Sequence, residues 1–294
     1  MVSIGVFDGV HLGHQEILRR NVEQAREHGH EPTVLTFRRH PKRVLLGRAP
    51  KAITTLDYRF ELFQRLGIEH VVALRFTDEL RQQAPEDFVE KTLLAGLDAR
   101  RFVLGFDSKF GRDRAGTPEL LEQLGHTVEV VGQVIVGQRP VSSTAIREAV
   151  ELGDLSGAAA MLGRPVSILG RVVRGDALGR KLGFPTANLD LMQGLHPPNG
   201  VWACRARILE GEEATPSGDA LPAVTNIGHR PTVSGEPGDP RVEVHLIDWQ
   251  GDLYGARVEV EFVAPLREER RFDGLEALVA QIELDVRAAR ERLA

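Results

Sequence analysis

Two contrasting patterns of apolar residues divide the sequence, and they constrain the fold more than any other feature. From residue 2 to about residue 150, short β-branched runs alternate with amphipathic stretches. The runs that predict strands are Val2–Val6, Thr33–Phe37, His70–Phe76, Arg101–Phe106 and His126–Val136. The stretches that predict helices are Gln15–His28, Asp57–Leu66, Pro85–Leu97, Thr117–Leu124 and a further helix from about Thr144. Strands that alternate with helices indicate an α/β fold with a parallel sheet.

The second pattern begins after Gly163-Arg164-Pro165, where predicted strands follow one another directly. These strands are Val166–Val173, Gly200–Leu209, Leu221–Ile227, Arg241–Asp248 and Ala256–Val263. Without helices between them, they indicate a mainly β half that forms an antiparallel sheet or a small barrel. Apolar residues at helical spacing from Leu275 to Leu293 predict a final helix, with Asp273 as its cap and Glu276 in a capping box. We expect the apolar face of this helix to pack on the barrel.

The length of 294 residues is sufficient for two domains, each with its own core. We place the N-terminal domain at residues 1–152 and the C-terminal domain at residues 165–294. Residues 153–164 between them are rich in alanine, so they predict a short linker helix rather than a flexible linker.

Composition excludes several classes of function. The chain has 37 Lys and Arg against 42 Asp and Glu, so its formal net charge of −5 gives no reason to expect nucleic acid or an anionic membrane as a partner. No apolar stretch approaches the roughly 20 residues of a membrane span. The single cysteine, Cys204, excludes an intrachain disulfide framework and a cysteine-only zinc site. We therefore expect a protein of the reducing cytoplasm.

The turn after the first strand, Phe7-Asp8-Gly9-Val10-His11-Leu12-Gly13-His14, predicts a phosphate site. Ligands of an open parallel sheet bind beyond the carboxyl ends of its strands, where the next helix offers unpaired N–H groups to phosphate. The imidazoles of His11 and His14 can donate hydrogen bonds to oxygens that gain charge during phosphate transfer. The alternative is a tight turn in which one histidine caps the helix and the other is solvated. A metal site is less favoured, because no further Cys or His cluster lies at ligand spacing.

A second candidate oxyanion site lies in the stretch Val141–Arg147, at the start of the last helix of this half. Its hydroxyls are those of Ser142, Ser143 and Thr144, and Arg147 follows one turn later. The alternative is an elaborate N-cap. Because one hydroxyl suffices for a cap, the cluster favours a binding role.

Together these motifs resemble those of the nucleotidyltransferases with HxGH and SSTxIR-type motifs. The stretches Thr36–Pro41 (TFRRHP) and Gly105–Gly111 (GFDSKFG) are similar to the versions found in bacterial FAD synthetases. The resemblance implies a Rossmann-like domain that transfers AMP from ATP to FMN, with loss of pyrophosphate and no enzyme-bound intermediate. It implies ATP-binding roles for Gly5, Phe7, Asp8, Gly9, His11, His14, Ser142, Ser143, Thr144 and Arg147, of which His11 and His14 are catalytic. It implies FMN-binding roles for His40, Pro41, Asp107 and Phe110.

This half departs from the family at two points. Ser108 stands where an aromatic residue is usual, which removes an aromatic contact with the flavin at that position. Family members usually carry further residues before the first strand, which here begins at Val2. We therefore expect that the start of this sequence is truncated or misassigned.

In the second half, the glycine-rich stretch Gly170–Asn188 predicts a loop whose backbone amides face phosphate. Arg180 and Lys181 can neutralise charge there, and no Walker sequence is present. Thr186 and Asn188 are two residues apart on an extended segment, so both side chains point the same way, and their oxygens suit Mg²⁺ with a nucleotide phosphate. A glycine-rich barrel corner with a polar edge is the alternative.

This stretch resembles the signature of riboflavin kinases, and later stretches follow that family in order. These are Asn226–Thr232, Val242–Leu246, Leu253–Gly255 and Leu266–Leu278. The resemblance implies a six-stranded antiparallel barrel that phosphorylates the ribityl 5′-hydroxyl of riboflavin. It implies Glu243 as general base, Thr186 and Asn188 as ligands of Mg²⁺ and ATP, and further ATP contacts from Gly175, Gly179, Arg180, Lys181, Gly183 and Pro185.

An alcohol that attacks phosphorus needs a proton acceptor, which supports the role of Glu243. The alternative is a solvated strand glutamate. Val244 stands where the family commonly has a small polar residue.

Both resemblances together imply a bifunctional enzyme that makes FMN from riboflavin and then FAD from FMN, with ATP and Mg²⁺ at two separate sites. One alternative is a nucleotidyltransferase for another phosphate monoester, with a non-catalytic flavin-binding second domain. Another is a non-catalytic regulator that binds a flavin or nucleotide. The expected partners are small molecules, and the sequence leaves the oligomeric state open.

Overall fold

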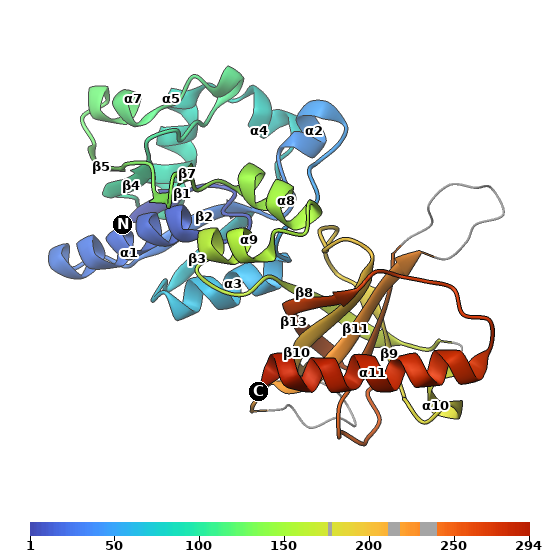
Figure 1. The fold of residues 1–294 in the computed structure, drawn as a ribbon. Helices are drawn as coiled ribbons and strands as arrows, with labels where there is room; N and C mark the ends of the chain where they lie inside the picture. Colours follow the sequence, from blue (N-terminus) through green and yellow to red (C-terminus); the bar gives the residue numbers. More distant parts are fainter. Residues whose placement is uncertain (176–177, 211–217, 230–239) are drawn as a thin grey trace. The chain divides into compact units, whose positions relative to one another are not determined.

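The computed structural model describes residues 1–175, 178–210, 218–229 and 240–294 (Figure 1). The chain forms two compact units. The first consists of Met1–Ala145 with Met161–Gly163, and the second of Ile146–Ala160 with Arg164–Ala294. None of the helices in the described ranges is long and apolar enough to cross a membrane.

The first unit contains a five-stranded parallel sheet, as the alternating pattern predicts. Its strands are β1 (Val2–Ile4), β2 (Thr33–Phe37), β3 (His70–Leu74), β4 (Arg101–Gly105) and β5 (Thr127–Val131), in the spatial order β3-β2-β1-β4-β5. The longer helices are α1 (Leu12–His28), α3 (Leu56–Arg65) and α7 (Pro118–Gln123). Because β1 is central and pairs with both β2 and β4, the turn that follows it lies at the middle of the sheet's carboxyl edge.

Two predicted elements of the first unit are interrupted. The predicted helix Pro85–Leu97 consists of α5 (Pro85–Asp87), a π-helical stretch (Phe88–Leu94) and α6 (Ala95–Leu97). The predicted strand His126–Val136 is wrong as one element, since β5 ends at Val131 before Gly132. The following β6 (Ile135–Val136) pairs instead with β7 (Arg139–Pro140) in a small antiparallel ribbon.

Short elements of this unit were not predicted, because they span too few residues to show a periodicity. They are α2 (Lys42–Leu46), α4 (Asp78–Gln82) and the 3₁₀ turn Arg112–Arg114. All three contribute residues to the cavity described below.

The second unit contains a closed antiparallel barrel of six strands, as the resemblance implies. The strands are β8 (Ser167–Val173), β9 (Ala187–Leu191), β10 (Gly200–Glu210), β11 (Leu221–His229), β12 (Pro240–Leu246) and β13 (Arg257–Arg267). Their order around the barrel is β10-β11-β12-β9-β8-β13. The short β9 closes the barrel between β12 and β8.

Four helices accompany the barrel strands along the chain. They are α8 (Ser143–Glu151), α9 (Leu155–Leu162), α10 (Leu178–Lys181) and α11 (Leu275–Leu293). The boundary between the two compact units falls inside both α8 and α9. The linker segment 153–164 is therefore largely helical, as its alanine content predicts.

Helix α11 packs on the barrel through its second half, as expected (Figure 1). Ala289 and Leu293 join a cluster with Val201, Ala203, Val224 and Ile247 of the barrel. The predicted cap is wrong: the residue before the helix is Gly274, and no side chain caps it, so Glu276 has no capping-box partner either. Leu275, predicted on the apolar face, is 57% exposed.

Glu259 and Glu261 of β13 make the stability of the barrel depend on pH. Glu259 is buried and accepts a hydrogen bond from Ser167 Oγ, and Arg207 lies 3.2 Å from Glu259 and 3.6 Å from Glu261. Burial raises the pKa of Glu261, and the negative charge of Glu259 raises it further. The folded barrel therefore favours the protonated form of Glu261 more than the unfolded chain does.

We expect Glu261→Gln to stabilise the second unit near neutral pH and to lose this advantage in acid. Because the pKa of Glu261 is raised on folding, its ionisation as pH rises lowers the stability of the folded unit, and glutamine removes that loss. Melting temperatures at about pH 8 and about pH 4.5 measure the effect, with exposed Glu283→Gln on α11 as the control. A difference from the parent that is equal at both pH values would contradict the expectation.

Candidate active sites

The turn from β1 to α1 has an unusual backbone. Phe7, Gly9 and Val10 have φ angles of 50°, 87° and 40°, in the left-handed region. Only Gly9 adopts this region without strain, and for the β-branched Val10 it is a clear outlier. A turn of this shape persists only where the surrounding structure holds it in place.

Asp8 connects the turn to a remote segment through several hydrogen bonds. Its buried carboxylate accepts hydrogen bonds of 3.1 Å from the backbone N–H groups of Ile53 and Thr54, and one of 3.2 Å from Thr54 Oγ1. The N–H of Gly9 donates in return to Thr54 Oγ1 at 2.9 Å. The predicted ATP-binding residue Asp8 therefore connects the turn to the segment that leads into α3.

The two sequence motifs meet at the same turn. Ser143 Oγ donates a hydrogen bond of 2.9 Å to the backbone carbonyl of Asp8. Ser142 Oγ accepts from the N–H of Ala145, so it caps α8, as the capping alternative predicts. Thr144 is exposed, and Arg147 follows one turn later on the same helix. The three hydroxyls thus differ in their surroundings, and that of Thr144 faces solvent.

His11 and His14 form a stacked pair at the N-terminus of α1. The N–H of His14 donates to His11 Nδ1 at 3.3 Å, so His11 is the N-cap, and the two ring centroids are 3.5 Å apart. Nδ1 of His14 is buried and has no hydrogen-bond partner within the described part of the chain. Burial lowers the pKa of His14 well below its ordinary value, and the charges of His11 and Arg59 lower it further. His14 is therefore a neutral imidazole near pH 7 and not the solvated residue of the alternative.

A cavity of about 590 Å³ lies beside this turn. It brings together seven residues that the sequence predicts for ATP or FMN: Gly5, Phe7, His14, His40, Pro41, Asp107 and Phe110. The predicted residues Asp8, Gly9, His11, Ser142, Ser143, Thr144 and Arg147 do not line it.

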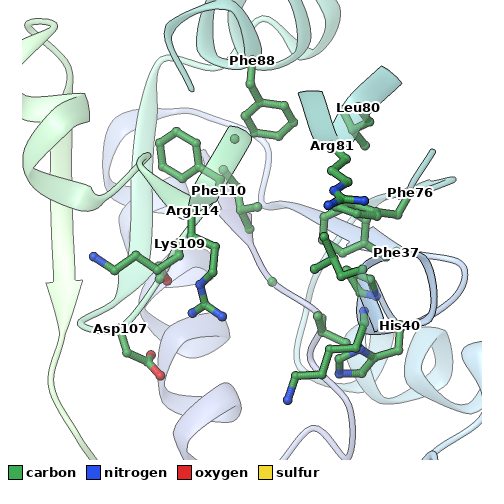
Figure 2. Close-up of a pocket in the computed structure, with 18 of the residues that line it drawn as sticks. Phe37, His40, Phe76, Leu80, Arg81, Phe88, Asp107, Lys109, Phe110 and Arg114 are labelled. Carbon is green, nitrogen blue, oxygen red and sulfur yellow. The ribbon is translucent and has the colours of Figure 1, made fainter. Parts of the chain in front are cut away.

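The walls of this cavity differ in character. Figure 2 shows Phe88 and Phe110 at one end, and Phe37 and Phe76 along one wall. The rings form two close pairs, with centroids 5.7 Å apart for Phe88–Phe110 and 5.6 Å for Phe37–Phe76. Basic side chains, among them Arg81, Lys109 and Arg114, lie on the same cavity. The aromatic surface that Ser108 lacks is therefore supplied from other elements.

In the barrel, Glu243 lies at the centre of a polar row that crosses three strands. It is directly opposite Asn188 of β9 and Asn226 of β11 in the strand register. Arg241, two residues earlier on the same strand, donates from Nη2 to Glu243 Oε1 at 2.8 Å. The carboxylate is therefore half-buried and paired, unlike the solvated glutamate of the alternative.

Two cavities of the barrel unit share Thr186. The larger, of about 370 Å³, is lined by Gly179, Glu243 and Phe272 among others, and the smaller, of about 270 Å³, by Arg180, Pro185 and Tyr254. Thr186 belongs to both linings. A group bound in one cavity would therefore meet a group bound in the other at Thr186.

The glycines of the predicted loop allow close approaches around these cavities. A Cβ on Gly175 would lie 2.2 Å from the Asn188 amide, and a Cβ on Gly179 would lie 2.4 Å from the Phe184 carbonyl oxygen. Gly183 has φ +87°. Lys181, on α10, lines neither cavity. Asp176 and Ala177 of this loop, and residues 230–232 of the second motif stretch, lie outside the described residues.

Comparisons with known proteins match both units. Residues 1–145 match the FAD synthetase family model and residues 162–293 the riboflavin kinase model. The bifunctional riboflavin kinase/FMN adenylyltransferases of Pseudomonas fluorescens and Haemophilus influenzae are 40% and 36% identical to this chain, covering 99% and 98% of it and 92% of each relative. The chain belongs to the bifunctional riboflavin kinase/FMN adenylyltransferase family. A crystal structure described as a macrolide-efflux protein from Streptococcus pneumoniae has the same fold, with a TM-score of 0.85, 31% identity, and coverage of 98% of this chain and 93% of that one.

Sequence reasoning missed several residues around the sites of this riboflavin kinase/FMN adenylyltransferase family member. Arg59 is 6% exposed, and it follows Tyr58 and precedes Leu62 and Phe63 on the buried face of α3. Arg59 has the same helical spacing as the buried residues of α3, and this spacing could have indicated a buried arginine. Arg267 and buried Asp285, joined at 2.8 Å, line the larger barrel cavity without any local motif that points to their pairing.

We expect Asp8→Asn to destabilise the first unit by about 2–3 kcal/mol, because an amide has one acceptor oxygen and turns its own N–H groups toward backbone donors. Urea unfolding followed by circular dichroism measures this free energy. The exposed Asp57→Asn on α3 is the matched control and should change it by less than about 0.5 kcal/mol. If both variants lose the same small amount, Asp8 does not hold the turn.

Proposed function

We propose that the second unit phosphorylates riboflavin to FMN and that the first unit converts FMN to FAD, each with its own molecule of ATP. The observation that carries this proposal is the pair of independent polar sites. One lies at the β1–α1 turn of a parallel sheet, and the other crosses a closed barrel beside two cavities that share Thr186. The relatives that match nearly the whole chain are named for both activities.

In the kinase site, Glu243 accepts the proton of the ribityl 5′-hydroxyl as its oxygen attacks the γ-phosphorus of ATP. The new O–P bond forms, the bond from the γ-phosphorus to the bridging oxygen breaks, and ADP leaves. We assign riboflavin to the larger cavity, which contains Glu243 and the Phe272 ring, and ATP to the smaller one. Thr186, common to both linings, supports transfer at their junction.

Mg²⁺ fits the donors of the kinase site. A threonine hydroxyl and an asparagine amide oxygen are hard neutral ligands, and the described residues contain no group of three or more His, Cys, Asp or Glu that could hold a metal alone. Thr186 and Asn188 would hold the ion together with ATP oxygens. When bound, it neutralises phosphate charge. Arg180, Lys181 and the backbone of Gly175, Gly179 and Gly183 are proposed to bind the same phosphates, and Pro185 to border them.

In the adenylyltransferase site, a phosphate oxygen of FMN attacks the α-phosphorus of ATP, the bond to the bridging oxygen breaks, and pyrophosphate leaves. No enzyme nucleophile takes part. Neutral His14 donates a hydrogen bond to the oxygens that gain charge, and His11 orients it. We propose further ATP contacts from Gly5, Phe7, Asp8, Gly9, Ser142, Ser143, Thr144 and Arg147.

We place the flavin of FMN among the phenylalanines of the first cavity, with His40, Pro41, Asp107 and Phe110 as contacts. Stacking on aromatic rings suits the apolar isoalloxazine, and the basic side chains of the lining suit the FMN phosphate.

We further propose that residues 1–152 and 165–294 are the functional domains and that the enzyme is cytoplasmic. Its partners are riboflavin, FMN and ATP rather than nucleic acid.

Glu243→Gln should reduce riboflavin phosphorylation by about 10²–10⁴-fold, because the amide cannot accept the hydroxyl proton. FMN adenylylation by the same preparation should stay at the parental rate. Separate assays of FMN formation and FAD formation measure this, with exposed Glu210→Gln on β10 as a matched control. Parental kinase turnover in the variant would remove Glu243 from the mechanism.

His14→Ala should reduce the FMN-to-FAD rate by about 10²–10³-fold, as expected when one donor to a developing charge is removed. Riboflavin phosphorylation should continue, so FMN accumulates when riboflavin and ATP are supplied together. The exposed His70→Ala serves as control. A folded His14→Ala enzyme that makes FAD at the parental rate would reduce the histidine pair to a turn and a cap.

A further inference from the structure

Arg59 is a buried cation behind the β1–α1 turn. The side chain is 6% exposed, although arginine is among the residues least often buried without a partner. Burial lowers the pKa of Arg59, and the negative charge of Asp8 opposes that shift. Removal of a guanidinium from water is costly, so its position requires a compensating interaction in the folded state.

Within the described part of the chain, the guanidinium interacts with the turn. Nη1 of Arg59 donates a hydrogen bond of 2.6 Å to the carbonyl of Val6, the residue directly before the left-handed Phe7. Asp8, one residue further, supplies the opposite charge. Nε of Arg59 is buried without a hydrogen-bond partner in the described part of the chain. The position of the guanidinium therefore does not satisfy all of its own hydrogen-bond donors. Arg59 and the Asp8 contacts together hold the turn on both sides of Phe7.

The same cation acts on His14. The Phe7 ring packs edge-on against the His14 ring, with centroids 5.2 Å apart, so a shift of Phe7 would move His14. Arg59 also belongs to the charges that keep His14 neutral. The charges that act on His14 are those of His11 and Arg59, and Asp8 acts in turn on Arg59. The charged or titratable residues that line the same cavity are His40, Lys42, Arg81, Asp107, Lys109, Arg112, Asp113 and Arg114.

We propose that Arg59 is a positioning residue of the adenylyltransferase site: it fixes the turn that carries His11 and His14 and keeps His14 as a hydrogen-bond donor in the reactive place. This inference rests on the proposed adenylyl transfer in the first unit. Arg59 touches neither substrate in this account, and it acts through the Val6 carbonyl, Phe7 and Asp8.

The test compares Arg59→Met and Arg59→Lys with Arg65→Met in the full-length chain. Arg65 lies on the same helix, is exposed, and faces Glu61 at 3.9 Å, so its loss controls for the removal of a helical arginine. Each variant is assayed for kcat and KM in FMN adenylylation, and the His14 ring is titrated by NMR, with His14→Ala to assign its signal. Riboflavin phosphorylation by the same preparations checks the second unit.

Arg59→Met should lower the adenylylation kcat by about 10- to 100-fold through misplacement of the histidine pair, with a much smaller change in KM for ATP. The His14 titration should move to higher pH, because a repelling charge is gone. Arg59→Lys should keep the parental titration and recover part of kcat, and Arg65→Met should match the parent in both. A purely structural role would lower the stability of the variant and leave the kcat of the folded enzyme at the parental value.

A folded Arg59→Met enzyme with parental kcat and parental His14 titration would overturn the inference. If Arg59→Met does not fold, Arg59→Lys decides: a kcat several-fold below the parent supports positioning by the guanidinium, and an unchanged kcat overturns it. A parent that forms no FAD from FMN would contradict the proposed function instead, and the His14 titrations would still test the effect of Arg59.

Discussion

The carboxylate of Asp8 connects the β1–α1 turn to residues 45 positions later in the chain, and the backbone of that turn depends on the connection. The turn combines left-handed Phe7 and Val10, which a free peptide would not maintain. Backbone donors of Ile53 and Thr54 hold it from one side, and Ser143 holds the Asp8 carbonyl from another. The strained backbone is thus stabilised by groups of two separate segments, and it presents a neutral histidine to the cavity.

In the barrel, strand register instead of a strained turn determines where the polar side chains lie. The short strand β9 closes the barrel between β12 and β8, which sets Asn188 directly beside Glu243. Alternation along β12 then buries Val242 and Val244, the latter at the edge of the smaller cavity, and leaves Arg241 and Glu243 on the lining of the larger one. A shift of one residue in this register would turn the carboxylate to the opposite face of the strand, so closure of the barrel also determines the position of Glu243.

The sequence predicted the elements whose pattern is local and long. Thr33–Phe37 is a strand with the predicted bounds, and the final helix begins and ends close to its apolar pattern. The sequence predicted an extended segment at Thr186 and Asn188 but not the strand β9, because an alternation of only five residues is also compatible with a loop. It could place Asp8 in a phosphate turn, but its hydrogen-bond partners are remote in sequence. The clustering of His14, His40, Asp107 and Phe110 followed from the motifs, whereas Phe76 and Phe88 of the aromatic walls lie outside them.

The central claim is that one chain adds two different parts of ATP to a flavin at two separate sites. The purified full-length chain is incubated with riboflavin and with ATP labelled at either the α- or the γ-phosphorus. The flavins are then separated, and the label in FMN and in FAD is measured. The account predicts γ-label in both FMN and FAD, and α-label in FAD alone. The appearance of α-label in FMN, or the absence of either label from FAD, would contradict it.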